Sequence, residues 1–384
     1  MRVVYVSTDP GIPVWGTKGA SVHVQEMLRA LVRRGVAVTV LSPRLEGTAP
    51  ADLADVATQV LPPAPKGDPA VRAKGLLAMN QTVIAALDAL APDFVYERHA
   101  LYAHAASEWA RSAGVPMVLE VNAPLLAEQS AHRTLSLPGA AETSVRRAMS
   151  AACLVSAVSE PVADHARQMG ARSVLVEPNA IDPARFPNPA PLKAAPFTLG
   201  FLGSLKPWHG LPLLIDAFAR LRAQIPDARL LVVGDGPERA ACAARLRELG
   251  CDDGAAFTGA LPACRVPAEL AGMDVGCAPY GKSDGFYFSP LKIYEYMAAG
   301  LPVVTTRVGH LPEIVRDGVT GRVVPPGDAA ALARALVVLA NDADFRRKTG
   351  RAGRASVLAD RTWDGVAERV IGRATCGRYA GSAA

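Results

Sequence analysis

Short apolar runs and amphipathic stretches alternate from the first residues of the chain. Residues 3–7 (VVYVS) form an apolar run that is typical of a buried strand in a parallel sheet. Residues 22–33 have the spacing of a helix with one apolar face, and residues 36–42 form a second apolar run. This order predicts a βαβ unit. Its glycine-containing loop follows the first strand, at the sheet edge where open α/β sheets bind ligands.

The alternation continues through the first half of the chain. We expect further strands at residues 94–99, 116–124, 153–159 and 173–177, and helices at residues 71–90, 103–113, 127–150 and 161–169. Residues 48–69 are rich in Pro and Ala without a clear period, which predicts a loop with strand fragments. Residues 178–196 carry six prolines, so this segment is the best candidate for a linker.

A second alternation begins after the linker. Strands are expected at residues 198–204, 228–236, 275–280, 302–306 and 321–326 and near residue 256, and helices at residues 211–224, 239–249, 266–271, 290–299, 329–340, 344–357 and 363–374. Both halves therefore share one element order. The predicted fold class is α/β, with two Rossmann-like domains, residues 1–185 and 186–360, facing each other across a cleft.

Composition narrows the class of protein. Half of the residues are hydrophobic, and much of that half is alanine. No run reaches the ~18–20 apolar residues of a membrane-spanning helix. The chain opens directly on a strand, without the layout of a signal peptide, so we expect a soluble cytoplasmic protein. Six widely spaced cysteines form no C-x-x-C pair, which disfavours both a zinc site and a disulfide framework.

The basic residues are scattered along the chain, and the net charge is a modest +5. No basic stripe is interleaved with aromatic residues, so nucleic-acid binding is not expected. The densest basic cluster, residues 29–35 (RALVRRG), is compatible with weak peripheral membrane contact or with a solvated helix end.

Residues 287–300 (YFSPLKIYEYMAAG) combine a well-defined helix start with an unexpected charge. Ser289 is a favourable N-cap, Pro290 suits the first helical position, and Gly300 suits the left-handed position after the helix. Lys292, however, lies in the first turn, where the helix dipole disfavours a cation. The segment therefore predicts a loop and a short helix whose start carries a misplaced lysine.

An anion bound at the helix start would explain this lysine, because phosphates bind at many helix N-termini. Glu295 lies on the same helical face, one turn further along. Lys292 and Glu295 together suggest a ligand with a phosphate end and a hydroxyl-rich end. A Lys–Glu pair on a solvated face explains the same two residues equally well.

Residues 291–328 (LKIYEYMAAGLPVVTTRVGHLPEIVRDGVTGRVVPPGD) resemble the retaining glycosyltransferases of family 4, which have the GT-B fold. The resemblance covers nearly the whole chain through the segments FLGSLKPWHG, LLVVGDGPE, AAFTGAL, MDVGCAPY and PNAID. It implies sugar transfer from a nucleotide diphosphate sugar, with UDP the expected nucleotide, to a hydroxyl of a glycan, lipid carrier or small molecule. It also implies that residues 1–185 select the acceptor and residues 186–360 hold the donor. The helix within residues 361–384 would cross back to the first domain.

The resemblance implies roles for individual residues. Lys206 and Lys292 would neutralise the leaving diphosphate, so that no metal is required, and Asn122 would hydrogen-bond the donor sugar or the acceptor. Glu295 would accept hydrogen bonds from the ribose hydroxyls. The other expected donor contacts are Gly19, Ser204, Tyr287, Phe288, Ser289, Pro290 and Leu291, and the expected acceptor contacts are Lys18, Arg98 and His99.

Several positions depart from the pattern of the family. Tyr287 stands where the first of two glutamates is common, and Asp284 is a candidate for the missing carboxylate. Ser204 and His209 replace an arginine and a lysine, and Asn122 replaces a histidine. These departures leave open a catalytically silent relative that binds nucleotide sugars as an accessory or scaffold protein. An NAD-dependent oxidoreductase is disfavoured, because no G-x-G-x-x-G follows the first strand.

Overall fold

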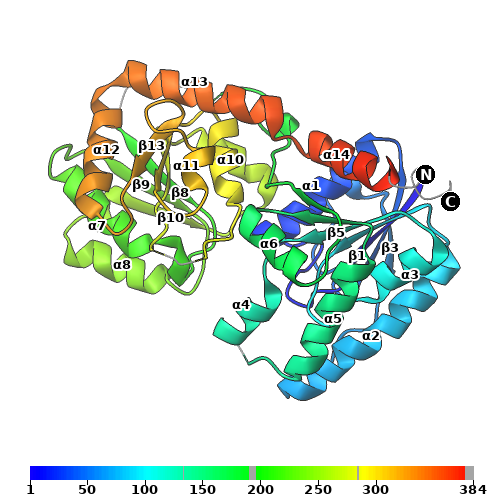
Figure 1. Cartoon of the computed structure of the whole chain (residues 1–384). Coiled ribbons are helices and arrows are strands. Elements are labelled where there is room, and N and C mark those ends of the chain that lie inside the picture. The colour runs from blue at the N-terminus through cyan, green and yellow to red at the C-terminus, as the bar shows by residue number, and fades with distance from the viewer. Residues whose placement is uncertain (133, 190–195, 283–284, 377–384) are drawn as a thin grey trace.

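Two lobes, each built on a parallel sheet, make up the chain. Figure 1 shows the computed structural model, which describes residues 1–132, 134–189, 196–282 and 285–376. Within these ranges each sheet is covered by helices on both faces (Figure 1). The predicted α/β fold with two Rossmann-like domains is confirmed. The predicted boundary after residue 185 lies in the segment that joins the two sheets.

The first sheet has the strand order β3-β2-β1-β4-β5-β6-β7, and neighbouring strands are parallel. Its strands are β1 (Arg2–Ser7), β2 (Ala37–Ser42), β3 (Ala57–Val60), β4 (Phe94–Arg98), β5 (Met117–Val121), β6 (Leu154–Ala157) and β7 (Val174–Val176). The helices are α1 (Gly19–Arg33), α2 (Pro69–Leu90), α3 (Ala105–Ala113), α4 (Leu125–His132), α5 (Pro138–Ala151) and α6 (Glu160–Gln168). The strand β3 occupies the segment predicted as a loop with strand fragments.

The second sheet has the strand order β10-β9-β8-β11-β12-β13 and is also parallel. Its strands are β8 (Thr198–Leu202), β9 (Arg229–Val233), β10 (Ala255–Gly259), β11 (Val275–Ala278), β12 (Val303–Thr306) and β13 (Gly321–Val324). The helices are α7 (Leu211–Arg222), α8 (Arg239–Glu248), α9 (Val266–Leu270), α10 (Leu291–Ala298), α11 (Leu311–Ile314), α12 (Ala329–Asn341), α13 (Ala343–Asp360) and α14 (Trp363–Cys376). All six strands were predicted; the short α11 was not.

Successive side chains of β1 enter different cores. Val4 and Val6 pack with residues of α2, α3, α5 and α6, whereas Val3 and Tyr5 pack with residues of α1 and α14. This division follows the two-residue period of a strand. Because both faces are buried, β1 is an uninterrupted apolar run in the sequence.

Both sheets reverse their strand order beside their first strand. The strand β1 lies between β2 and β4, and β8 lies between β9 and β11. At such a switch point the loops that leave neighbouring strands run to opposite faces, which opens a crevice where α/β sheets bind ligands. The carboxyl ends of β1 and β8 are therefore the expected walls of a site.

The helix α14 packs on the first lobe, although it follows α13 of the second (Figure 1). Trp363 at its start is only 1% exposed, and its ring meets the ring of His23 edge-on at 4.5 Å between centroids. Arg33 of α1 pairs with Asp364 at 2.9 Å and with Asp182 at 3.0 Å. The helix α14 thus connects the second lobe, from which it continues, to the first lobe, on which it packs.

The basic cluster at residues 29–35 is largely neutralised within the chain. Arg29 pairs with Asp52 at 2.5 Å and with Glu26 at 3.1 Å, and Arg33 holds two aspartates as described. Weak peripheral membrane contact through this cluster stays a prediction. Among the helices of the described ranges, not one combines the length and apolar character that crossing a bilayer requires.

Candidate active site

The carboxyl end of β8 opens into a glycine turn. Gly203 has a φ of +133°, and its N–H donates to the carbonyl of Val233 at 2.9 Å. A Cβ at Gly203 would lie 3.0 Å from Nζ of Lys292, and a Cβ at Gly234 would lie 2.0 Å from the carbonyl oxygen of Gly203. A side chain at Gly203 would therefore fill the space in front of the lysine, and a side chain at Gly234 would clash with the carbonyl of Gly203.

Lys292 is a buried cation at this edge. It is 7% exposed, and its Nζ lies 4.1 Å from the centroid of the Phe201 ring and 5.7 Å from that of Tyr280. In the part of the chain that the structure describes, Nζ has no hydrogen-bond partner. Burial lowers the pKa of Lys292 to about 7. A buried ammonium without a partner is costly, so an anion is the natural complement of this site.

No side chain caps the start of α10. The predicted N-cap role of Ser289 is wrong: Pro290 is the N-cap residue and the helix begins at Leu291. The Ser289 hydroxyl instead accepts the backbone N–H of Asn179 at 2.8 Å, and the Asn179 side-chain amide donates to the Ser289 carbonyl. Because the hydroxyl is engaged there, the first-turn N–H groups of α10 lack a side-chain partner and remain suited to an anion.

Glu295, one turn into α10, is also buried, at 6% exposed. It does not lie on a solvated face, so that reading of the Lys–Glu pair is wrong. Its Oε1 accepts a hydrogen bond from Arg185 at 3.0 Å. The helix ends as predicted, with Gly300 at φ +76°.

Two other predicted donor-side residues occupy the same loop. Lys206 is the N-cap residue of a short 3-10 helix, Pro207–His209, and its Nζ lies 5.9 Å from the centroid of the Trp208 ring. Ser204 is exposed and its carbonyl contacts Nδ1 of His209. Burial and the positive charges of Lys292 and Lys206 lower the pKa of His209 to about 3, so the histidine is neutral. Lys206 of this loop and Lys292 of α10 are thus two cations close to an uncharged ring.

A different arrangement surrounds Glu120 in the first lobe. Its carboxylate lies 2.9 Å from Nε2 of His23 and accepts hydrogen bonds from Arg98 at 2.7 Å and from the Tyr96 hydroxyl at 2.6 Å. Asn122 donates its side-chain amide to the same carboxylate. Burial raises the pKa of Glu120, but His23, Arg98 and Tyr96 outweigh it and hold the pKa well below its usual range. Asn122 is thus oriented by an ionised, fully engaged carboxylate.

The predicted acceptor residues on β4 and after it lie in the interior. Arg98 is 8% exposed and is engaged with Glu120, and His99 is 7% exposed. Burial lowers the pKa of His99 to about 4. Strand-end position alone did not indicate this burial. Contact of either residue with an acceptor stays a prediction.

The glycine loop after β1 is shorter than predicted. The helix α1 begins at Gly19, three residues earlier than expected, and Lys18 is its exposed N-cap residue. The amide of Gln25 donates to the carbonyls of Val14 and Gly16 at 2.8 and 2.9 Å, which holds the loop against the helix. Gly19 is therefore a helical residue rather than part of a flexible loop.

Tyr287 contacts the first lobe. Its hydroxyl donates to Oε2 of Glu128 on α4 at 3.0 Å, and its carbonyl accepts from the Ser159 hydroxyl at 2.8 Å. The ring of Phe288 packs against the ring of Tyr287, with 4.3 Å between the two centroids. Asp284 lies outside the described residues. Residue 287 is not a glutamate, but the carboxylate of Glu128 on the first lobe lies beside it. Sequence reasoning missed Glu128.

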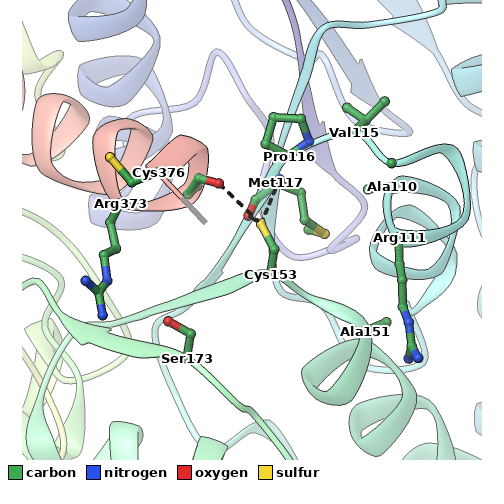
Figure 2. A pocket seen from close by; sticks show the side chains of 12 residues that line it. Ala110, Arg111, Val115, Pro116, Met117, Ala151, Cys153, Ser173, Arg373 and Cys376 are labelled. Atoms are coloured by element: carbon green, nitrogen blue, oxygen red, sulfur yellow. Dashed lines mark hydrogen bonds between the residues drawn. The ribbon is translucent and has the colours of Figure 1, made fainter. Parts of the chain in front are cut away.

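A separate cavity lies at the opposite end of the first sheet, beside the amino ends of its strands. It measures about 570 Å³ and is lined near the amino ends of β5, β6 and β7 by Met117, Cys153 and Ser173 (Figure 2). Arg111 and Arg373 stand at separate sides of it (Figure 2). This cavity is remote from the switch points, so it is not part of the candidate site.

Matches to known families cover most of the chain. Residues 17–185 match the model described as Glycosyltransferase Family 4, and residues 196–342 match the model described as Glycosyl transferases group 1. The first match includes the strand β5, which carries Glu120, and the second includes the glycine turn and Lys292. The chain belongs to glycosyltransferase family 4, and its fold is GT-B.

Individual relatives differ in how much they share with the chain. A GDP-mannose-dependent alpha-(1-6)-phosphatidylinositol monomannoside mannosyltransferase of Mycolicibacterium smegmatis is 36% identical over 42% of this chain and 43% of its own length. A glycogen synthase of Mycobacterium tuberculosis is 29% identical over 96% and 92%. The chain spans about half the length of the mannosyltransferases that it matches. The structure of sucrose-phosphate synthase from Thermosynechococcus elongatus superposes with a TM-score of 0.75 at 20% identity, covering 99% of this chain and all of that one.

Proposed function

We propose that the protein transfers a sugar from a nucleotide diphosphate sugar to a hydroxyl acceptor. The observation that carries this proposal is the buried ammonium of Lys292, which has no hydrogen-bond partner among the described residues. It lies at the first turn of α10, beside the glycine turn after β8. A diphosphate would supply the missing partner and would also accept from the uncapped N–H groups of Leu291 and Lys292.

We further propose that the transfer retains the anomeric configuration. The bond between the anomeric carbon and the leaving phosphate oxygen breaks, and the acceptor oxygen bonds to the same face of the carbon. The departing phosphate oxygen takes the acceptor proton. Lys292 and Lys206 neutralise the charge that develops on the diphosphate, which is the main electrostatic task, and no metal is required for it. Asn122, fixed by Glu120, hydrogen-bonds the donor sugar or the acceptor.

The nucleotide and acceptor form the finer part of the proposal. We expect the nucleotide to be UDP. GDP is the alternative, because one mannosyltransferase relative is named as GDP-mannose-dependent. Glu295 would bind the ribose of either nucleotide, so it does not choose between them. The acceptor is a hydroxyl of a glycan, a lipid carrier or a small molecule.

The test combines turnover with binding. The protein is incubated with UDP- and GDP-sugars and a panel of hydroxyl acceptors, with and without EDTA. Nucleotide release and the anomeric configuration of the product are then measured. We expect transfer with retention and in EDTA; Lys292→Met should lose it, and Lys348→Met, which removes an exposed lysine of the same lobe, should not.

Binding without turnover would support the alternative, a catalytically silent relative that serves as an accessory or scaffold protein. The engagement of Tyr287 with Glu128 is the observation that keeps this alternative open, because it alters the sugar end of the site. Failure of every nucleoside diphosphate to bind would overturn both readings.

A further inference from the structure

Arg185 connects two buried carboxylates that belong to different lobes. It lies in the segment between the sheets, and its side chain is 12% exposed. Its Nη1 donates to Oε1 of Glu26 on α1 at 3.3 Å, and its Nη2 donates to Oε1 of Glu295 on α10 at 3.0 Å. Nη2 also donates to the carbonyl of Ala263 at 3.0 Å, which fixes the guanidinium in place.

This contact leaves the two oxygens of Glu295 in different states. Oε1 accepts a hydrogen bond from Arg185, while no hydrogen bond to Oε2 is found among the described residues. The carboxylate is on the same face of α10 as Lys292, one turn further along. If the diphosphate of a ligand lies against Lys292, the group next to the diphosphate would lie near Oε2 of Glu295.

We propose that Arg185 is a positioning residue that orients the Glu295 carboxylate toward the ribose hydroxyls of the donor nucleotide. The inference rests on the proposed function, in which Glu295 is the ribose ligand. Arg185 itself does not touch the donor. By holding Glu26 at the same time, it links the ribose site to α1 of the acceptor lobe.

The electrostatics of the cluster supply a specific signature. Burial raises the pKa of Glu295, and the charges of Arg185 and, more weakly, Lys292 oppose the rise. Burial also raises the pKa of Glu26 to about 7. The charges of Arg185 and Arg29 oppose this rise, and the charge of Asp182 adds to it. Removal of Arg185 would raise the pKa of Glu295 further. At a given pH more of the carboxyl would then be protonated, and a rise in pH would restore its charge.

The experiment compares Arg185→Met with wild type by titration calorimetry, using UDP or GDP, whichever wild type binds, and its 2′-deoxy and 3′-deoxy analogues. The readout is the ratio of ribose to deoxy affinity at several pH values. The direct contribution of Lys292 to diphosphate binding cancels in this ratio, because both ligands carry the diphosphate. We expect Arg185→Met to lose about 10-fold in the ratio near neutral pH, and to recover part of it at higher pH.

Two further variants serve as controls. Arg354→Met removes an arginine that donates to the carbonyls of Phe186 and Ala298, in the same segment and at the far end of α10, without touching Glu295. It should leave the ratio unchanged. Arg185→Lys keeps the charge without the two-armed geometry, and should lie between wild type and Arg185→Met; it also serves if the methionine variant does not fold.

The outcomes separate the two proposals. If wild type binds no nucleoside diphosphate, the proposed function fails. If wild type distinguishes ribose from deoxyribose and the Arg185 variants keep the same ratio at every pH, only the role of Arg185 is overturned. An equal loss of affinity for the nucleotide and its deoxy analogues would mark Arg185 as merely structural.

Discussion

Two buried charges, one in each lobe, are treated in opposite ways. Glu120 is 3% exposed and is surrounded by His23, Arg98, Tyr96 and Asn122, whose contacts outweigh burial and keep it ionised. Lys292 is 7% exposed, has no hydrogen-bond partner among the described residues, and has its pKa lowered to about 7. A buried charge that keeps all its partners holds its neighbours in position, and removal of one partner is strongly destabilising. A buried charge without them is destabilising until a ligand arrives.

Replacement of the engaged charge should have the largest effect on stability. Glu120→Ala leaves Arg98 buried without its counter-ion and removes the contact of His23, so the free energy of unfolding should fall by about 3–5 kcal/mol. Urea denaturation followed by circular dichroism measures this. The matched control is Glu142→Ala, which breaks an exposed pair with Arg146 on α5 and should cost less than about 1 kcal/mol. Equal losses in the two variants would show that Glu120 is not held as described.

Replacement of the unpartnered charge should act in the other direction. Lys292→Met removes a buried ammonium and should stabilise the ligand-free protein by about 1–4 kcal/mol. The folded-state pKa lies below the unfolded value of 10.5, so the cost of Lys292 is full below about 7 and disappears as the pH rises toward 10.5. The same variant should bind nucleoside diphosphates about 100-fold more weakly, because a charge-assisted contact is lost.

Thermal unfolding with and without nucleoside diphosphate, together with calorimetric titration, checks both halves of this prediction. Nucleoside affinity serves as the control, since a nucleoside lacks the diphosphate and should lose much less. A variant that is less stable and binds the diphosphate normally would reverse the contrast between the two lobes.

Sequence periodicity was sufficient for the sheets but not for the contacts between lobes. Apolar runs and amphipathic stretches have different periods, so strands and helices could be told apart. Lys292 and Glu295 could be paired because three residues separate them on one helix. Arg185 lies in a proline-rich segment without periodicity, and Glu295 is 110 positions away, so only the folded chain brings them together.

The error at Ser289 has a similar origin. Capping preferences assign a side chain to its own helix, whereas here the Ser289 hydroxyl accepts the backbone N–H of Asn179, also 110 positions away. Burial of Arg98 and His99 was missed for a related reason. The residues that cover a strand end come from distant parts of the sequence, and a strand pattern does not report them.

A third buried ionisable group tests whether its partners, rather than its depth, decide whether it is charged. Glu97 on β4 is 1% exposed, like Glu120, but no described cation pairs with it; the hydroxyl of Ser107 lies 3.4 Å away. Burial raises the pKa of Glu97 to about 8, and Ser107 opposes this only partly. The folded protein therefore keeps a proton that the unfolded chain releases near pH 4.5. Its stabilising contribution is full below that value and is lost as the pH rises toward about 8.

Glu97→Gln should remove this pH dependence. Between about pH 5.5 and about pH 7.5, wild type should lose about 2–3 kcal/mol of unfolding free energy relative to the variant, since one pKa unit corresponds to about 1.4 kcal/mol. Urea denaturation of both proteins at the two pH values measures the difference, and the titration of every other group cancels. Parallel pH profiles would mean that Glu97 is ionised despite its burial. Glu97 would then be ionised like Glu120 although it lacks the partners of Glu120. The contrast between buried groups with and without partners would not hold within this lobe.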